Sequence, residues 1–461
     1  MASVPKNSAR RLWCYGELEG ESVLNIQDES LYLHTPSLVS TPRHQESELC
    51  LTQAMCAMEQ SLLSQTEVDD TKCPYLFATW DEYYLIIRYL SCDGNKAPKA
   101  FAFDVEMYLN NFLASSHTLR LSLCAVAADV YLSQEAAATY FQQARQALLL
   151  EFSSPTVECV LACTLLFQLA VKNGDIVSGT KYLQWGLIIL CSLQLEIDPN
   201  DLQFVQCLNE RQSEERRRVF WEFYHSYLLA SSLDDGDVLD IPNFTQVNAP
   251  QQVLDGSNTI FRHKPVLYFE CLILRLISTS KRRYATPPSS ILDSCTNLQL
   301  SLNALRARIP PSLLITSKFP ESMTAEEESF CMLQVSVAQD ALPKFNILLH
   351  AATSIIFRPT LFLATKIEYP PHVKRAIATA ATECIRSGLQ IVTIASFSLY
   401  ISSTTTPETR DLFSMEGSQF ALFEAIAVFW FVYTKMDPRW WSLITCRIMT
   451  SACYVSDCTR L

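Results

Sequence analysis

The chain has 461 residues, 49% of them hydrophobic and 18% charged, which is enough apolar sequence for a large core. Its formal net charge is −12, and an acidic surface repels a phosphate backbone, so direct nucleic-acid binding is not expected. The 17 cysteines follow a polar start without a signal-peptide pattern, which predicts reduced thiols in an intracellular protein. The most apolar run, residues 420–433, is too short to span a bilayer and contains Glu424, so we expect no membrane association.

The polar residues 1–70 predict a partly disordered N-terminal arm, with a short helix over 48–63 as its one ordered candidate. Residues 71–461 are expected to form a helical domain, with a motif core at about 135–255 and a C-terminal helical half at about 260–461. The early cysteines are Cys14, Cys50, Cys56, Cys73 and Cys92. They contain no Cys-x-x-Cys pair, so no zinc site is expected among them.

Helical periodicity dominates after residue 75, and most of the 21 prolines fall between apolar periodic stretches. The predicted helices, in chain order, are 80–90, 104–113, 119–132, 134–152, 157–171, 176–195, 213–233, 265–280, 291–307, 326–357, 371–397 and 418–435. Pro343 is expected to kink or split the helix over 326–357. The sequence therefore predicts an all-α fold, a large multi-helix array of antiparallel helix hairpins with no regular repeat.

The densest pattern lies in the predicted helix over 213–233. An apolar stripe at helical spacing is formed by Val219, Phe220, Phe223, Tyr224 and Tyr227. Trp221 is expected to be the buried anchor of this helix. Glu214 and Glu215 are predicted in the first turn, where the helix dipole favours carboxylates. The residues alone favour a solvated charged start, with one arginine, Arg217 or Arg218, held by a carboxylate from another helix.

We find no pattern that predicts catalysis. The chain has no Gly-rich phosphate loop, nucleophile elbow or His-Glu-x-x-His helix, so no catalytic, cofactor-binding or metal-binding residue is predicted, and the chain is not expected to be an enzyme. Ser278 and Lys281 form a Ser-x-x-Lys tetrapeptide, a spacing that arises by chance in long chains. His225 and His350 are interpreted as structural histidines.

Several patterns follow one another in an order that resembles a known family. Tyr182, Trp185 and Gly186 lie in the second arm of a predicted hairpin that ends in residues 195–199, and an Arg-Arg-x-x-Phe-Trp motif follows. This order, over residues 75–435, resembles the fungal-specific transcription factor domain, the middle homology region of zinc binuclear cluster regulators. The motif residues are Arg216, Arg217, Arg218, Phe220, Trp221, Tyr224, Gly236, Pro250, His350, Arg358 and Pro359.

The chain departs from the family pattern at three places. Tyr227 stands where the family has Asp, and Asp237 stands where it has Arg, which suggests an ion pair lost as a unit. The six-cysteine zinc cluster is absent. The chain is therefore expected to be either part of a longer regulator or a regulator without its own DNA reader.

The resemblance implies the regulatory, effector-responsive domain of a fungal transcription regulator. It implies location in the nucleus with exchange to the cytoplasm, co-regulators or transcription machinery as partners, and DNA contact only indirectly or through a missing segment. A small-molecule effector and a homodimer fit the same implication, and no cofactor is expected unless an N-terminal cluster supplies zinc. Two alternatives stay open: a helical interaction scaffold or co-regulator, and a helical enzyme such as an isoprenoid-processing one. The nearest metal motif for that enzyme is the acidic stretch 234–237, which is also typical of a turn.

Overall fold

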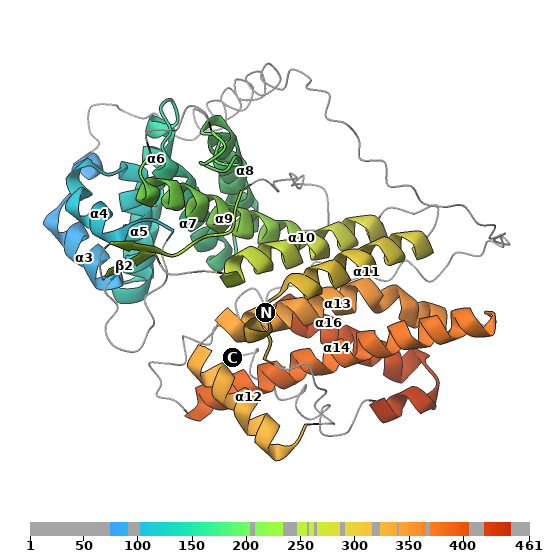
Figure 1. Cartoon of the computed structure of the whole chain (residues 1–461). Helices are drawn as coiled ribbons and strands as arrows, with labels where there is room; N and C mark the ends of the chain where they lie inside the picture. Colours follow the sequence, from blue (N-terminus) through green and yellow to red (C-terminus); the bar gives the residue numbers. More distant parts are fainter. Residues whose placement is uncertain are drawn as a thin grey trace, which may run out of the picture. The chain divides into compact units, whose positions relative to one another are not determined.

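The computed structural model describes residues 74–90, 102–202, 208–233, 247–255, 258–261, 265–285, 291–315, 323–338, 341–365, 369–404 and 419–443 (Figure 1). The chain divides into two units, 1–68 and 69–461. The first unit lies outside the described residues, so the predicted N-terminal arm and its helix over 48–63 stay predictions. In the described part of the second unit, thirteen α-helices and one two-stranded sheet confirm the all-α prediction.

The N-terminal half of the described chain holds two short 3₁₀ helices and seven α-helices. In order these are η2 (Pro74–Leu76), α3 (Trp80–Leu90), α4 (Val105–Asn110), η3 (Phe112–Ala114), α5 (His117–Tyr131), α6 (Gln134–Glu151), α7 (Val157–Lys172), α8 (Ile176–Ser192) and α9 (Glu210–Leu233). Helix α7 is apolar nearly all round and packs against α5, α8 and α9, which explains why its residues are mostly buried.

The second half begins with a β-hairpin and continues as helices. Its elements are β1 (Val253–Asp255), β2 (Asn258–Phe261), α10 (Pro265–Ala285), α11 (Ile291–Arg308), η4 (Pro311–Leu313), α12 (Ala325–Ala338), α13 (Ala341–Thr365), α14 (Pro371–Thr404), α16 (Gln419–Lys435) and η7 (Pro438–Leu443). Helices α13, α14 and α16 pack against one another, and α10 packs against both α9 and α13 (Figure 1). Helix α10 therefore links the helices before and after it.

Short polar residues set several helix starts. Thr79 and Glu82 exchange hydrogen bonds between side chain and backbone, Glu82 Oε2 lying 2.9 Å from the Thr79 amide. Asn209 and Gln212 do the same at the start of α9. These reciprocal pairs satisfy amides that the first turn leaves without partners. Between α7 and α8, Gly174 has φ +78°, a left-handed conformation that favours glycine.

The predicted division of 326–357 near Pro343 is confirmed: the stretch forms two helices, α12 and α13, and Pro343 lies in the first turn of α13, where a missing N–H costs nothing. Two other features differ from the prediction. Helix α13 also continues through Pro359 to Thr365 instead of ending at residue 357. The β1–β2 pair, with Val253 opposite Phe261, was not predicted, although Asp-Gly between two apolar runs is a hairpin signal.

Helix α13 is long and apolar enough to cross a membrane by length and composition, with a mean hydropathy of 1.6 over its best window. However, 67% of that window is buried inside the fold. Its side chains pack against α10, α14 and α16, so its apolar character is explained by a place in the core.

Candidate functional site

The charged start of α9 is buried, which corrects the prediction of a solvated one. Glu214 and Arg218 are each 1% exposed and Arg217 is 6% exposed. Because α9 begins at Glu210, Glu214 and Glu215 lie in its second turn and not in the first turn, where the helix dipole would stabilise them. Buried charges are stable only when paired, so the partners of these side chains decide what the motif does.

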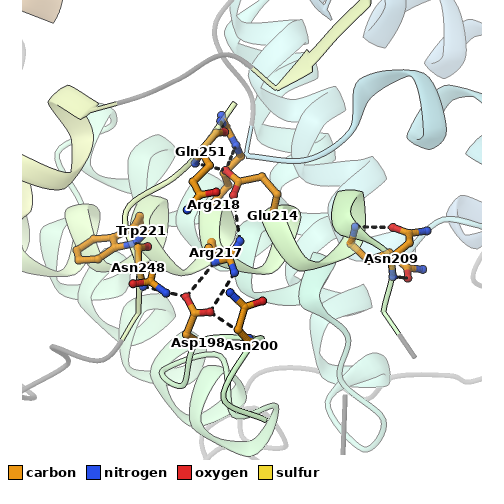
Figure 2. A network of polar contacts seen from close by, with 10 residues as sticks. Asp198, Asn200, Asn209, Glu214, Arg217, Arg218, Trp221, Asn248 and Gln251 are labelled. Atoms are coloured by element: carbon orange, nitrogen blue, oxygen red, sulfur yellow. Dashed lines mark hydrogen bonds and ion pairs between the residues drawn. The ribbon is translucent and has the colours of Figure 1, made fainter. Parts of the chain in front are cut away.

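Arg217 forms a bidentate ion pair with Asp198, a residue that is 0% exposed. Its Nε lies 2.9 Å from Oδ2 and its Nη2 lies 3.0 Å from Oδ1 (Figure 2). The Asp198 carboxylate also accepts hydrogen bonds from the backbone amides of Asn200 and Asn248. Burial alone would raise the pKa of Asp198, but the bonds from Arg217 and the two amides lower it to about 2. Asp198 therefore stays ionised at neutral pH.

Arg218 pairs with Glu214 on its own helix, with 2.7 Å between Nε and Oε1. The same two side chains bind the backbone of Gln251: Arg218 Nη2 donates to its carbonyl at 2.6 Å, and its amide donates to Glu214 at 2.8 Å. Burial raises the pKa of Glu214, an effect that Arg218 and the Gln251 amide oppose. The pair thus neutralises two buried charges and holds a separate piece of backbone.

Trp221 completes the attachment of this segment. It is 2% exposed, as expected for an anchor, and its Nε1 donates to the Asn248 carbonyl at 2.8 Å (Figure 2). Pro250 is buried between the two anchored residues, and because proline has no N–H it leaves no amide without a partner. Residues 247–251 are therefore fixed to α9 by backbone bonds on both sides.

Arg216 has a third target. Its Nη2 donates to the carbonyl of Leu193, the residue that caps the C-terminal end of α8, at 2.6 Å. The three arginines thus reach the end of α8, the turn after it and residue 251, and Arg217 and Arg218 also share Glu214 as an ion-pair partner. The prediction of a carboxylate from another helix is wrong in detail, because Asp198 lies in the turn after α8 and Glu214 lies on α9 itself.

The contact between α8 and α9 depends on Gly186. A Cβ at this position would clash with the buried ring of Phe223 and lie 3.1 Å from the Cβ of Cys163. Gly186→Ala is expected to lower the free energy of unfolding by about 1–3 kcal/mol in urea denaturation, despite the better helix propensity of alanine. Gly179→Ala on the same helix is the control, with a nearest contact at 3.2 Å and an expected change near zero. Equal effects of both variants would contradict this contact.

Beside the motif, carboxylates gather at the start of α5. Glu151 accepts from the His117 amide at 2.7 Å and Glu158 accepts from the Ser116 amide at 2.6 Å, so both satisfy first-turn amides. Glu215 of α9 accepts from the Asp104 amide at 3.4 Å. Burial, added to the negative charges of Glu158 and Asp104, raises the pKa of Glu215 to about 7, which the amide bond only partly offsets.

Glu215 is therefore expected to make stability depend on pH. Because its pKa is higher folded than unfolded, its favourable contribution is complete below about pH 4.5 and is lost as the pH rises through about 7. The free energy of unfolding of Glu215→Gln should rise by roughly 2 kcal/mol relative to that of wild type as the pH increases from about 5 to about 8. Urea denaturation at several pH values measures this. The exposed Glu210→Gln is the control, and a Glu215→Gln profile parallel to wild type would contradict the expectation.

The later motif residues form a separate group on α13. Arg358 donates to Glu424 of α16 at 2.7 Å, and Ser354, one turn earlier, donates to the same carboxylate at 3.3 Å. Burial and the charge of Arg306 lower the pKa of His350 to about 3, so this histidine is neutral at physiological pH. Among the described contacts none joins this group to the α9 motif. Gly236 lies outside the described residues.

The structure also describes the surroundings of the Ser-x-x-Lys pair and of Tyr227. Ser278 and Lys281 both donate to backbone carbonyls of α9, at Leu228 and Ser232, so this Ser-x-x-Lys pair helps to pack α10 on α9. Tyr227 is 2% exposed, and its ring lies 6.0 Å from that of Phe223. Asp237 lies outside the described residues, so the lost ion pair stays a hypothesis.

Sequence reasoning missed several of the residues that matter. The sequence places Asp198 at the end of a predicted helix hairpin but predicts no contact for its side chain. The buried Glu82–Arg120 ion pair is not predicted at all. Arg120 also donates to the carbonyls of Tyr75, Leu76 and Phe77, fixing the chain just before α3. Among the described residues, no group of three or more His, Cys, Asp or Glu side chains is placed to hold a metal ion. No family model, curated protein or solved structure matches the chain, so its family resemblance rests on its own residues.

Proposed function

We propose that the chain is the regulatory domain of a fungal transcription regulator, acting in the nucleus through partner proteins and not through its own DNA contacts. The observation that carries this proposal is the way in which the Arg-Arg-x-x-Phe-Trp motif is used. Arg216, Arg217 and Trp221 bind the end of α8, Asp198 and Asn248, three backbone or side-chain targets that lie in separate segments. We call these contacts, which tie residues 193, 198 and 247–251 to α9, the α9 joint. The guanidinium groups and the indole of the motif are suited to these polar targets, and this structural role supports the family resemblance.

The same contacts support indirect action on DNA. Arg217 and Arg218 are buried and bonded to carboxylates inside the fold, so their charges are already neutralised. Arg216 is bonded to the α8 terminus. A phosphate backbone would have to displace these partners, and the net charge of −12 opposes its approach. The function proposed for the motif is therefore to position other surfaces of the domain.

A reporter experiment tests the proposal. The full chain is joined to an unrelated DNA-binding domain, and expression of a reporter gene with the matching sites is measured against that DNA-binding domain alone. The fusion is expected to change reporter output severalfold. Asp198→Ala should abolish the change, because it breaks the joint, while the exposed Asp201→Ala in the same turn should retain it.

The alternatives give different results. If the wild-type fusion accumulates to the same level but leaves the reporter unchanged, the regulatory proposal is wrong and an interaction scaffold becomes the better account. If the isolated chain converts an isoprenoid diphosphate in a magnesium-dependent way, the enzyme alternative replaces it. In that case, changing Asp234 and Asp235 should abolish turnover.

A further inference from the structure

Three aromatic side chains at the start of α3 extend into solvent. Phe77, Trp80 and Tyr84 are 79%, 69% and 65% exposed, which are the largest values for any aromatic residue in the described part of the chain. The centroids of the Trp80 and Tyr84 rings lie 6.4 Å apart, so these rings form a continuous surface. We call the three residues the aromatic patch. Contiguous exposed apolar surface is typical of an interaction site.

A buried ion pair holds the backbone beneath the aromatic patch. The guanidinium of Arg120 is paired with Glu82 and donates to the three carbonyls of residues 75–77. Glu82 in turn accepts a hydrogen bond from the Thr79 amide at 2.9 Å. The chain is therefore fixed on both sides of Trp80. A surface that is already ordered loses little conformational entropy when a partner binds, which favours a binding role for this segment.

The polar groups of the aromatic patch indicate what kind of backbone it accepts. Among the described residues, none accepts a hydrogen bond from the indole N–H of Trp80 or from the hydroxyl groups of Tyr83 and Tyr84. The carbonyls of a helical partner are already bonded within its helix, and a β-strand requires an open sheet edge that α3 does not offer. A polyproline II segment has no internal hydrogen bonds, so its carbonyls are free to accept from indole and phenol donors.

The charges around the aromatic patch favour basic residues in the same partner. Asp81 is exposed beside Trp80, and Glu106 is exposed on α4, which contacts α3 (Figure 1). Neither carboxylate forms an ion pair with another described residue. The guanidinium of Arg88 on α3 lies over the Tyr131 ring, 4.5 Å from its centroid. Together with the net charge of −12, the free carboxylates attract a cationic segment.

The size of the aromatic patch suits a short peptide. From their exposed fractions, the three rings offer roughly 300–500 Å² of surface. A stable protein–protein interface buries more, about 800 Å² on each partner. Transient complexes bury less, and exposed Trp and Tyr side chains supply much of the binding energy in such contacts.

We propose that the aromatic patch binds a proline-rich segment of a partner protein, with basic residues beside its prolines. The prolines pack on the rings of Phe77, Trp80 and Tyr84, and a basic residue pairs with Asp81. This inference rests on the proposed function in that it names the chemistry of one partner protein, but the binding itself is measured without a reporter gene.

Fluorescence anisotropy of a labelled peptide tests the proposal with the full chain. The probe is a short fluorescein-labelled run of consecutive prolines with an arginine at each end. Wild type is expected to bind it with a dissociation constant on the order of tens of micromolar. Trp80→Ala should raise that constant at least about tenfold. The control is Phe423→Ala, which removes a ring that is 60% exposed on α16 and should bind like wild type.

Two further comparisons test the conformation and the charge of the partner. The same peptide with alanine in place of every proline should bind at least about tenfold more weakly, because it does not adopt polyproline II. Asp81→Asn should raise the dissociation constant about threefold at low salt and less at high salt. Glu135→Gln, which changes an exposed first-turn carboxylate of α6, should have no effect. Unchanged circular dichroism confirms that the variants fold.

Several outcomes would overturn the inference. Wild type that does not bind the proline peptide up to about 1 mM has no such site. Equal binding of the alanine peptide would mean that polyproline II is not recognised, and binding unaffected by Trp80→Ala would place the site elsewhere. Sedimentation with phosphatidylcholine vesicles that is lost in Trp80→Ala, without peptide binding, would make the patch a lipid-binding surface.

The proposed function fails or holds separately. If the peptide binds as expected and the reporter fusion has no effect, the regulatory role is wrong and the binding site stands. If the fusion changes reporter output and the peptide does not bind, the regulatory role stands and the proline-binding site is wrong.

Discussion

Asp198→Ala is expected to lower the free energy of unfolding by about 3–5 kcal/mol, a large share of a typical domain's stability. The reason is that Arg217, which is 6% exposed, loses its bidentate carboxylate, and its buried charge is left with Glu214, which lies 3.5 Å away and is already paired with Arg218. The Asn200 and Asn248 amides lose their acceptor at the same time. Urea denaturation followed by circular dichroism measures the change.

Asp201→Ala is the matched control for this variant. Asp201 lies three residues further along the same turn and is exposed, so its removal should change the free energy of unfolding by less than about 0.5 kcal/mol. Asp198→Asn should fall between the two, because the amide preserves the shape and one acceptor but not the charge. Similar losses for Asp198→Ala and Asp201→Ala would mean that the ion pair does not stabilise the fold.

Trp221→Ala is expected to cost about 3–5 kcal/mol, because it opens a cavity in the centre of the fold. The Trp221 ring packs against those of Phe220, Tyr224 and Tyr268, the last at a centroid distance of 5.0 Å. The variant also removes the donor that Nε1 supplies to the Asn248 carbonyl. The free energy of unfolding is measured in urea, as for Asp198→Ala.

Two further variants separate the causes. Trp221→Phe keeps most of the ring but loses the hydrogen bond, so it should cost about 1–2 kcal/mol. Trp80→Ala removes an indole that is 69% exposed on α3 and should cost less than about 1 kcal/mol. A loss below 1 kcal/mol for Trp221→Ala would show that α9 does not lie at the centre of the fold.

Local sequence patterns predicted the helices well because helical periodicity reflects burial. Helix α7 was predicted at 157–171 and is found at Val157–Lys172, and α16 was predicted at 418–435 and is found at Gln419–Lys435. The start of α9 was misplaced by three residues. The sequence does carry a signal for the earlier start, since Asn209 and Gln212 have the spacing of a reciprocal cap.

The partners of the motif could not be predicted from the sequence, because they depend on contacts between distant segments. The sequence predicts that Arg217 or Arg218 needs a carboxylate, yet Asp198, the partner of Arg217, precedes it by 19 residues in an irregular turn. Arg218 and Trp221 bind backbone atoms of residues 251 and 248, and no side-chain pattern identifies a backbone acceptor. Periodicity predicts which face of a helix is buried, but not which segment covers it.

Hydrogen exchange of the full chain, followed by mass spectrometry, tests most directly whether the motif is an internal joint. The amides of Asn248 and Gln251 donate to the buried carboxylates of Asp198 and Glu214. Peptides covering residues 247–251 should therefore exchange as slowly as those of α9, although the segment is neither helix nor strand. In Asp198→Ala the same peptides should exchange rapidly while α14 stays protected. Rapid exchange of residues 247–251 in the wild-type chain would contradict the account, since it would mean that the arginines and Trp221 do not hold this segment.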